Sequence, residues 1–289
     1  MGLGIATVKL NIDMWQRGFF KDIHRVFEMG AQELYLKKGD FEQLIKMGGV
    51  PGYKPENFAA LEKFPSGPFC PAKPFYDLLG ISQYACADFS RQHGAIPIDL
   101  NNPLEDKSLY GQYDLVTDCG TNEHVFNTGE AYRTMHRLCR PGGLLIIIQT
   151  IYGGNGFYAY TPAFFENMAA ANRYKILFSS FILDTSAPTP DGSTDQYHIP
   201  LSQSLLDMFE WNKSRNVGIC YVMQKQSPDD FRLASQYYYE TLHNYGYHLQ
   251  YGMNPISREY VNIYLDKKVL LKVFLGELSL RIKRKFGLA

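Results

Sequence analysis

The sequence predicts an α/β fold, a Rossmann-like, doubly wound and mostly parallel sheet of seven strands with a helical C-terminal extension. Three observations support this prediction. Short apolar segments alternate with segments of helical spacing through the first 225 residues. Leu144–Ile148 is a continuous apolar run, which is typical of a parallel strand buried on both faces. Two of the predicted strands end in a carboxylate, Asp88 and Asp118, as expected at the ligand-binding edge of such a sheet.

The first elements are expected in the following order. Residues 11–20 have the spacing of a short amphipathic helix, with Met14, Trp15 and Phe19 on one face. An apolar strand over 24–28 enters a tight turn at Gly30. Residues 38–74 are rich in Gly and Pro, which indicates an irregular insertion that could cover a cofactor as a lid. A short helix and then a strand are expected over the residues 75–80 and 83–87.

The alternation of strands and helices continues to residue 225. Strands are expected over 95–98, 113–118, 144–148, 175–181 and 217–224. Helices are expected over 129–139, which stops at a turn over 141–143, and near 202–211. Two further helices are predicted after the alternation ends, over 231–243 and 258–286. The sequence therefore predicts an N-terminal helical segment (1–21), a main domain (22–225, with the insertion at about 38–74) and a helical extension (226–289).

Composition excludes several classes of protein. The formal net charge is zero, so charge gives no support to nucleic acid as the main partner. The five cysteines are scattered without a Cys-x-x-Cys pair, which indicates a reducing compartment and argues against a disulfide framework or a zinc site. No group of His and carboxylate residues has metal-ligand spacing, so no metal is predicted. The chain lacks a signal peptide pattern and a long apolar run, and a soluble cytoplasmic enzyme is expected.

The carboxyl ends of the predicted strands bring several polar residues to one edge of the sheet. Gly30 lets the backbone approach a ligand closely. Asp88 ends the second strand, where both oxygens of its carboxylate could accept hydrogen bonds from ribose hydroxyls. Asp99, after the third strand, could accept from an adenine amino group. A nucleoside-containing cofactor is predicted, and the Gly-x-Gly-x-x-Gly of nicotinamide-binding sheets is absent.

Three segments resemble motifs of class I S-adenosylmethionine (SAM) dependent methyltransferases. Residues 26–32 (VFEMGAQ) are similar to the first motif, 113–124 to the fourth-strand motif, and 135–146 to the helix, turn and fifth strand that follow. The resemblance covers residues 22–225 and implies SAM as the cofactor. It implies that Glu28 and Gly30 line the methionine end, Asp88 the ribose, and Asp99 with Leu100 the adenine. Two further cofactor-binding residues are implied, Gln32 and Cys119.

The candidate catalytic residues are His124 and Glu123, just after the fourth strand, where an acceptor would meet the methyl group. An imidazole has an unperturbed pKa of about 6.5 and suits removal of a hydroxyl proton near neutrality. His124 could instead be a packing or cofactor-adjacent residue. The loop after the fifth strand is the expected acceptor wall, because aromatic faces suit sugar rings or planar acceptors. Its candidate substrate-binding residues are Tyr152, Phe157, Tyr158 and Tyr160.

The resemblance implies an O-methyltransferase that acts on a hydroxyl of a sugar or glycan. Two alternatives stay open, a small-molecule methyltransferase of natural-product biosynthesis and a non-catalytic methyltransferase-like binding subunit. The second is favoured by the single glycine in the first motif. Residues 267–285 carry seven Lys or Arg among apolar residues. This tail is expected to dock on its own domain or on a homodimer partner, or to contact the inner face of a membrane peripherally.

Overall fold

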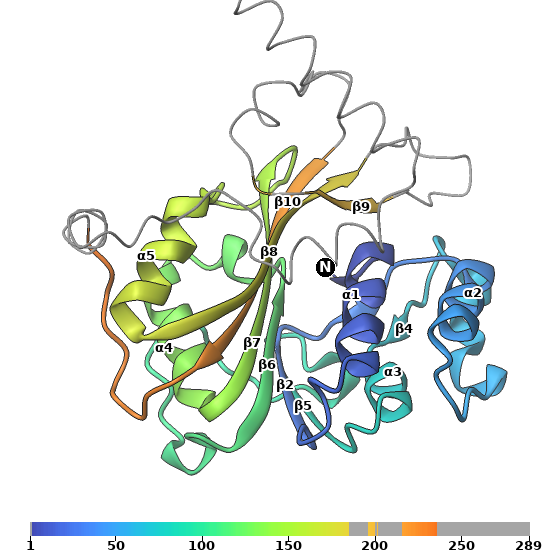
Figure 1. Cartoon of the computed structure of the whole chain (residues 1–289), viewed down its shortest axis with the longest axis horizontal. Helices are drawn as coiled ribbons and strands as arrows, with labels where there is room; N and C mark the ends of the chain where they lie inside the picture. Colours follow the sequence, from blue (N-terminus) through green and yellow to red (C-terminus); the bar gives the residue numbers. More distant parts are fainter. Residues whose placement is uncertain (1, 185–195, 200, 202–215, 236–289) are drawn as a thin grey trace, which may run out of the picture.

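The computed structural model describes residues 2–184, 196–199, 201 and 216–235 (Figure 1). Its central sheet has seven strands in the order β5-β2-β6-β7-β10-β8-β9. Neighbours from β5 to β7 are parallel, whereas β10 is antiparallel to β7 and β8, and β9 is antiparallel to β8. The predicted seven-stranded doubly wound sheet is therefore confirmed. The strand bounds are β2 Arg25–Met29, β5 Gln83–Ala87, β6 Tyr113–Cys119, β7 Cys139–Tyr152, β8 Tyr174–Asp184, β9 Gln196–Ile199 and β10 Asn216–Lys225.

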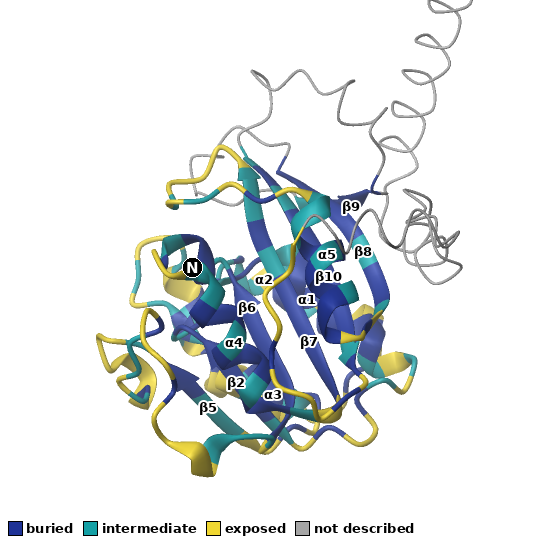
Figure 2. Ribbon diagram, turned by 90° about the vertical axis from the view of Figure 1, so that its left-hand side faces the viewer, coloured by how far each residue is buried: buried dark blue, intermediate teal, exposed yellow. Residues whose placement is uncertain are grey.

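Helices cover both faces of the sheet. Figure 1 shows α1 (Ile5–Gln16), α2 (Lys38–Gly48) and α3 (Lys73–Leu78) on one side, and α4 (Thr128–Leu138) and α5 (Pro162–Asn172) on the other. The side chains of β6 and β7 alternate between the two cores that result. This double burial explains the continuous apolar run that predicted β7, and Figure 2 shows these strands buried at the centre of the molecule.

The insertion at 38–74 is regular rather than irregular, so that expectation was wrong. It contains α2, a 3-10 helix η1 (Pro55–Lys63) and β4 (Cys70–Pro71). β4 forms a three-stranded sheet with β1 (Gly2–Leu3) and β3 (Glu33–Leu34). Phe41, Phe58 and Phe75 join these pieces, with ring centroids 4.7 and 5.9 Å from that of Phe41. The aromatic core outweighs the Gly and Pro content that predicted a loop.

Three other elements differ from expectation. The helix predicted over 11–20 runs from Ile5 to Gln16, because apolar residues ahead of position 11 are also buried. The strand expected over 95–98 is reduced to one parallel bridge between Ile96 and Ala87, next to Pro97, which has no N–H to continue a ladder. The turn expected over 141–143 lies within β7, with Gly142 at a φ of +78°.

The C-terminal predictions are only partly open to comparison. Residues 231–235, the start of a predicted helix, are not helical. The helices predicted near 202–211 and over 258–286, and the basic tail, lie outside the described residues. Within the described part of the chain, every helix is too short or too polar to cross a membrane. Short 3-10 helices complete the fold: η2 Gln92–Gly94, η3 Lys107–Leu109 and η4 Asn122–His124.

Candidate functional site at the strand ends

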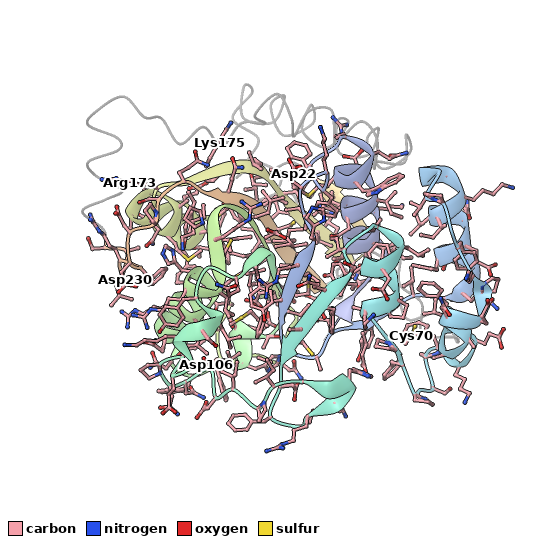
Figure 3. The ribbon with its side chains drawn as sticks, turned by 90° about the horizontal axis from the view of Figure 1, so that it is seen from below. Asp22, Cys70, Asp106, Arg173, Lys175 and Asp230 are labelled. Carbon is pink, nitrogen blue, oxygen red and sulfur yellow. The ribbon has the colours of Figure 1, made fainter. Side chains whose placement is uncertain are left out.

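The sheet has a topological switch point between β2 and β6. The chain passes from β2 outward to β5 and then returns to the other side of β2 to form β6. In doubly wound sheets, ligands bind outside the carboxyl ends of the strands at such a point. Figure 3 shows the opposite edge, with Asp22, Asp106 and Lys175 labelled, where β2, β6 and β8 begin.

Gly30 forms the turn after β2. Its φ is +92°, and a Cβ atom at this position would lie 2.4 Å from Thr121 Oγ1, so only glycine fits. The Thr121 hydroxyl donates a hydrogen bond to the Met29 carbonyl (2.5 Å) and accepts one from Gln32 Nε2 (3.0 Å). The turns after β2 and β6 are therefore locked together at the switch point.

Asp88, at the end of β5, lies against the same turn. One carboxylate oxygen accepts from the N–H of Ala31 (3.3 Å) and the other from the N–H of Ser90 (2.7 Å). Partial burial raises the pKa of Asp88, but hydrogen bonds from Ser90 and Ala31 outweigh it, and the pKa lies below the usual range. An ionised carboxylate is thus fixed beside Gly30, as the sequence predicted.

Asp99 and Leu100 lie in the next loop. The Asp99 carboxylate accepts hydrogen bonds from the Asn101 backbone (2.9 Å) and from the Asn102 side chain (2.6 Å). Leu100 is buried in the core on the α4 side. Asn101 in turn binds Asn127, the N-cap of α4, at 2.9 and 3.0 Å. The loop predicted to face adenine is therefore anchored to the helix after β6.

The Glu28 side chain points into the core at the end of β2. It is fully buried on the face of α3, where its carboxyl oxygens accept hydrogen bonds from the hydroxyls of Tyr76 (2.9 Å) and Tyr84 (2.5 Å). Burial raises its pKa to about 8. Glu28 therefore belongs to a buried hydrogen-bond network between β2, α3 and β5. The cofactor contact implied by the resemblance stays a prediction.

Glu123 and His124 form a pair after β6. The Glu123 carboxylate accepts hydrogen bonds from the backbone N–H (2.6 Å) and the hydroxyl (3.1 Å) of Thr150 on β7. Its Oε1 lies 3.6 Å from Nε2 of His124. The His124 side chain is 32% exposed and that of Glu123 only 6%, so a fixed, buried carboxylate lies behind an accessible imidazole.

A polar cleft opens beside this pair. It consists of two adjoining cavities of about 410 and 220 Å³ that share seven lining residues. The outer cavity is also lined by His124, Tyr35 and Phe64, and the inner one by Cys119 and Gln149. The shared residues come from the N-terminal segment, from η4 and from the ends of four strands: Gly2, Gly4, Glu123, Thr150, Asp184, Gln196 and Asn216.

The four aromatic residues predicted as the acceptor wall are not among the residues that line this cleft. Tyr160 is buried, and its hydroxyl contacts Thr128 (2.8 Å). The Tyr158 hydroxyl donates to a backbone carbonyl, and Tyr152 and Phe157 are exposed. The same loop does line the cleft, but through Gly153, Gly154 and Asn155 instead of its aromatic residues.

Two further features of this edge are the burial of Asp118, a predicted strand-end carboxylate, and three cleft residues that were missed from the sequence. Asp118 is fully buried at the end of β6, where it accepts from Thr121 N–H (3.0 Å) and from Gln149 Nε2 (2.5 Å). Burial raises its pKa to about 7. The sequence predicted the place of this carboxylate at the end of a strand but not its burial. Asp184, Gln196 and Asn216 carry no motif, and only the pairing of β8, β9 and β10 brings them to the cleft.

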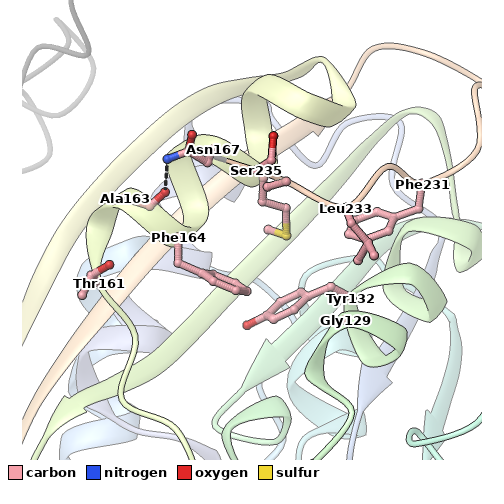
Figure 4. Close-up of a pocket in the computed structure, with 11 residues that line it drawn as sticks. Gly129, Tyr132, Thr161, Ala163, Phe164, Asn167, Phe231, Leu233 and Ser235 are labelled. Atoms are coloured by element: carbon pink, nitrogen blue, oxygen red, sulfur yellow. Dashed lines mark hydrogen bonds between the residues drawn. The ribbon is translucent and has the colours of Figure 1, made fainter. Parts of the chain in front are cut away.

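A second pocket is apolar and lies on the face of α4 and α5 (Figure 4). Its volume is about 470 Å³, and residues 231–235 form one wall. The rings of Tyr132 and Phe164 meet inside it with centroids 5.4 Å apart. Tyr132 is its one titratable lining residue among those described, and burial raises the pKa of its hydroxyl well above the usual value. The described residues do not include a group of three or more His, Cys, Asp or Glu placed to bind a metal.

Comparisons with known proteins give structural likenesses alone. No family model and no curated protein matches the sequence. One similar solved structure is a SAM-dependent methyltransferase, possible histamine N-methyltransferase, from Thermotoga maritima, with 12% identity over 75% of this chain and 92% of that one and a TM-score of 0.36.

Two other likenesses are of the same kind. A SAM-dependent methyltransferase from Archaeoglobus fulgidus is 10% identical over 75% of this chain and 94% of that one, with a TM-score of 0.37. The 1,6-didemethyltoxoflavin-N1-methyltransferase of Burkholderia thailandensis, solved with S-adenosylhomocysteine, is 13% identical over 76% and 80%, with a TM-score of 0.33.

Proposed function

We propose that this chain is a class I SAM-dependent methyltransferase that transfers a methyl group to a hydroxyl of a sugar or glycan. One observation carries the proposal. The β2–β6 switch point brings the Gly30 turn and the Asp88 carboxylate to the same edge as the Glu123–His124 pair, which opens onto a polar cleft. This arrangement supports a candidate nucleoside site beside a candidate acid–base site, as a group transfer from a nucleoside cofactor requires.

The residues at the switch point fit SAM. Asp88 is ionised and would accept hydrogen bonds from the ribose hydroxyls. Gln32 is buried, and its Nε2 donates to the Met29 carbonyl (2.9 Å) and to Thr121 Oγ1 (3.0 Å), so it would hold the Gly30 turn beside the methionine end. When bound, SAM would supply a methyl group already activated on a sulfonium.

The chain's own part in the reaction is to bind, orient and deprotonate the acceptor. His124 would take the proton of the acceptor hydroxyl, since its imidazole is accessible from the cleft. Glu123 cannot turn away, because Thr150 fixes both of its oxygens, so its carboxylate stays beside the imidazole. Gly156 supports this arrangement, because a Cβ there would lie 2.9 Å from Glu123 Cβ and Cγ.

The first test is cofactor binding. Asp88→Ala should weaken the binding of S-adenosylhomocysteine by isothermal titration calorimetry, because charge-assisted hydrogen bonds worth about 1.5–3 kcal/mol each are lost. Asp106→Ala is the matched control. Asp106 also accepts from the N–H two residues later (Ser108, 2.9 Å), but it lies at the opposite edge. Equal affinity in the folded Asp88→Ala variant, or no binding by the wild type, would refute the cofactor assignment.

A further inference from the structure

Asp118 is a buried carboxylate to which the proposed reaction gives no part. It lies at the end of β6 and is 0% exposed. Its Oδ1 accepts hydrogen bonds from the backbone N–H groups of Thr121 (3.0 Å) and Asn122 (3.2 Å). Its Oδ2 accepts a hydrogen bond from Nε2 of Gln149 on β7 (2.5 Å). One carboxylate therefore joins two elements, the turn after β6 and the end of β7.

The bonds from Thr121 and Asn122 fix η4, the turn that carries Glu123 and His124. η4 has only three residues, and the Thr121 side chain does not cap it. So short a 3-10 turn has few hydrogen bonds of its own, and other contacts must set its position. Asp118 supplies two such contacts at the start of the turn, directly before Glu123.

The bond from Gln149 fixes the end of β7, which holds the Glu123 carboxylate. Gln149 is 1% exposed and directly precedes Thr150. The N–H (2.6 Å) and the hydroxyl (3.1 Å) of Thr150 donate to the two oxygens of Glu123. Asp118 thus contacts both elements that bring Glu123 and Thr150 together. With Glu123 held in this way, its Oε1 lies 3.6 Å from Nε2 of His124.

Asp114, a second carboxylate on β6, makes a similar set of hydrogen bonds at the opposite edge of the sheet. It accepts from the backbone N–H groups of His24 and Arg25 (both 2.8 Å) and from Nε of Arg140 (2.5 Å). Partial burial raises the pKa of Asp114, but these hydrogen bonds outweigh it, and the pKa lies below the usual range. The three donors of Asp118 described above are all neutral, and burial raises its pKa to about 7. Ionised Asp118 therefore costs the fold more than Asp114, and stability alone does not account for it.

We propose that Asp118 is a positioning residue for the methyl-transfer site, which fixes η4 and the end of β7 and thereby holds the Glu123 carboxylate beside His124. This deepens the proposed function and rests on it. Asp118 has no exposed surface with which to touch a substrate or cofactor, so it acts through these two elements. Because a misplacement of about 1 Å can lower a rate about 100-fold, such an anchor affects catalysis without contact with the reacting atoms.

The first test measures hydrogen exchange of the Thr150 amide by NMR in the full chain, because this N–H bonds to the Glu123 carboxylate. In Asp118→Ala, we expect it to exchange at least about tenfold faster relative to the other amides of β7. Asp114→Ala is the matched control, since it removes a similar set of bonds from the same strand and should leave this ratio unchanged. An unchanged ratio in Asp118→Ala, or an equal change in Asp114→Ala, overturns the inference. Where Asp118→Ala does not fold, Gln149→Leu cuts one of the two connections and is judged by the same outcomes.

The second test separates this inference from the proposed function. On an active acceptor, Asp118→Ala should lower kcat about 10- to 100-fold and change the KM for SAM less than about threefold, because it displaces the acid–base pair and not the cofactor. Asp114→Ala should keep kcat near that of the wild type. An equal fall in both variants, or none in Asp118→Ala, overturns the positioning role. Faster exchange of Thr150 in Asp118→Ala, together with a wild type that binds no SAM, refutes the proposed function and supports the anchoring of Glu123.

Discussion

Single residues show how far sequence reasoning reaches at this site. Asp88 and Gly30 were predicted from their place after strands, and a hydrogen bond joins their turns in the structure. Glu28 follows the same rule in sequence, yet the alternation of β2 directs its side chain into the core on the α3 side. Asp184 and Asn216 were not predicted, because what places them is the pairing of strands distant in sequence. The sequence predicted where a residue lies along its strand. It did not predict which face the side chain points to, or which distant strands pair.

His124 is the residue on which the proposed reaction depends. His124→Gln should lower the methyl-transfer rate about 10²- to 10⁴-fold and leave S-adenosylhomocysteine affinity nearly intact, because the proton acceptor is lost while the cofactor edge is unchanged. Rates on an active acceptor and calorimetry of the cofactor check this together. A parallel loss of both would mark His124 as a cofactor or packing residue instead.

Among the elements, strands were predicted better than the segments between them. β5 matches its predicted bounds, and β6 extends one residue beyond them, because both are short apolar runs between clear turn signals. The prediction for the insertion was wrong, since its regular structure depends on contacts among Phe41, Phe58 and Phe75, which are far apart in sequence. Rules based on Gly and Pro content detect turns but cannot detect a shared aromatic core.

The turn after β2 allows a prediction about stability. Gly30→Ala should lower the free energy of unfolding by about 2–4 kcal/mol, through a positive φ and overlap with Thr121 Oγ1. Gly18→Ala is the control, because Gly18 also has a positive φ (+78°) but has open space around its Cβ position. Its cost should be about 1 kcal/mol. Chemical denaturation of both variants measures the difference, and equal costs would show that the Thr121 contact does not constrain the turn.

The described part of the molecule is built on a seven-stranded sheet between two cores, and the sequence predicted the fold class from the signs of this arrangement. The apolar run of β7 indicated two covered faces, and helices do cover both. What the sequence did not predict is the polar content of these cores. Glu28 is buried with Tyr76 and Tyr84 in one core, and Asp118 with Gln149 lies on the other side. Such groups link the stability of the entire fold to pH.

Glu28 makes that link testable. Burial raises its pKa from the ordinary 4.5 to about 8, so between these values the folded chain keeps a proton that the unfolded chain has released. Its contribution therefore lowers stability as pH rises through this window, by up to about 1.4 kcal/mol per pH unit. Glu28→Gln removes this titration and leaves that of Asp118 in place. Denaturation curves from pH 5 to 8 should show the wild type losing stability relative to Glu28→Gln, and parallel pH profiles would contradict the assignment.

The contact between α1 and β9 has a consequence for synthesis of the chain. Ala6 donates its N–H to Gln196 Oε1 (3.4 Å), and its carbonyl contacts His198 Nε2 (2.9 Å), so the first helix is fastened by residues about 190 positions later. At about 5–20 residues per second, a ribosome needs on the order of 10–40 s to reach β9. For that interval, the apolar face of α1 cannot complete its packing. The attachment of α1 to β9 would thus be among the last contacts that a nascent chain can form.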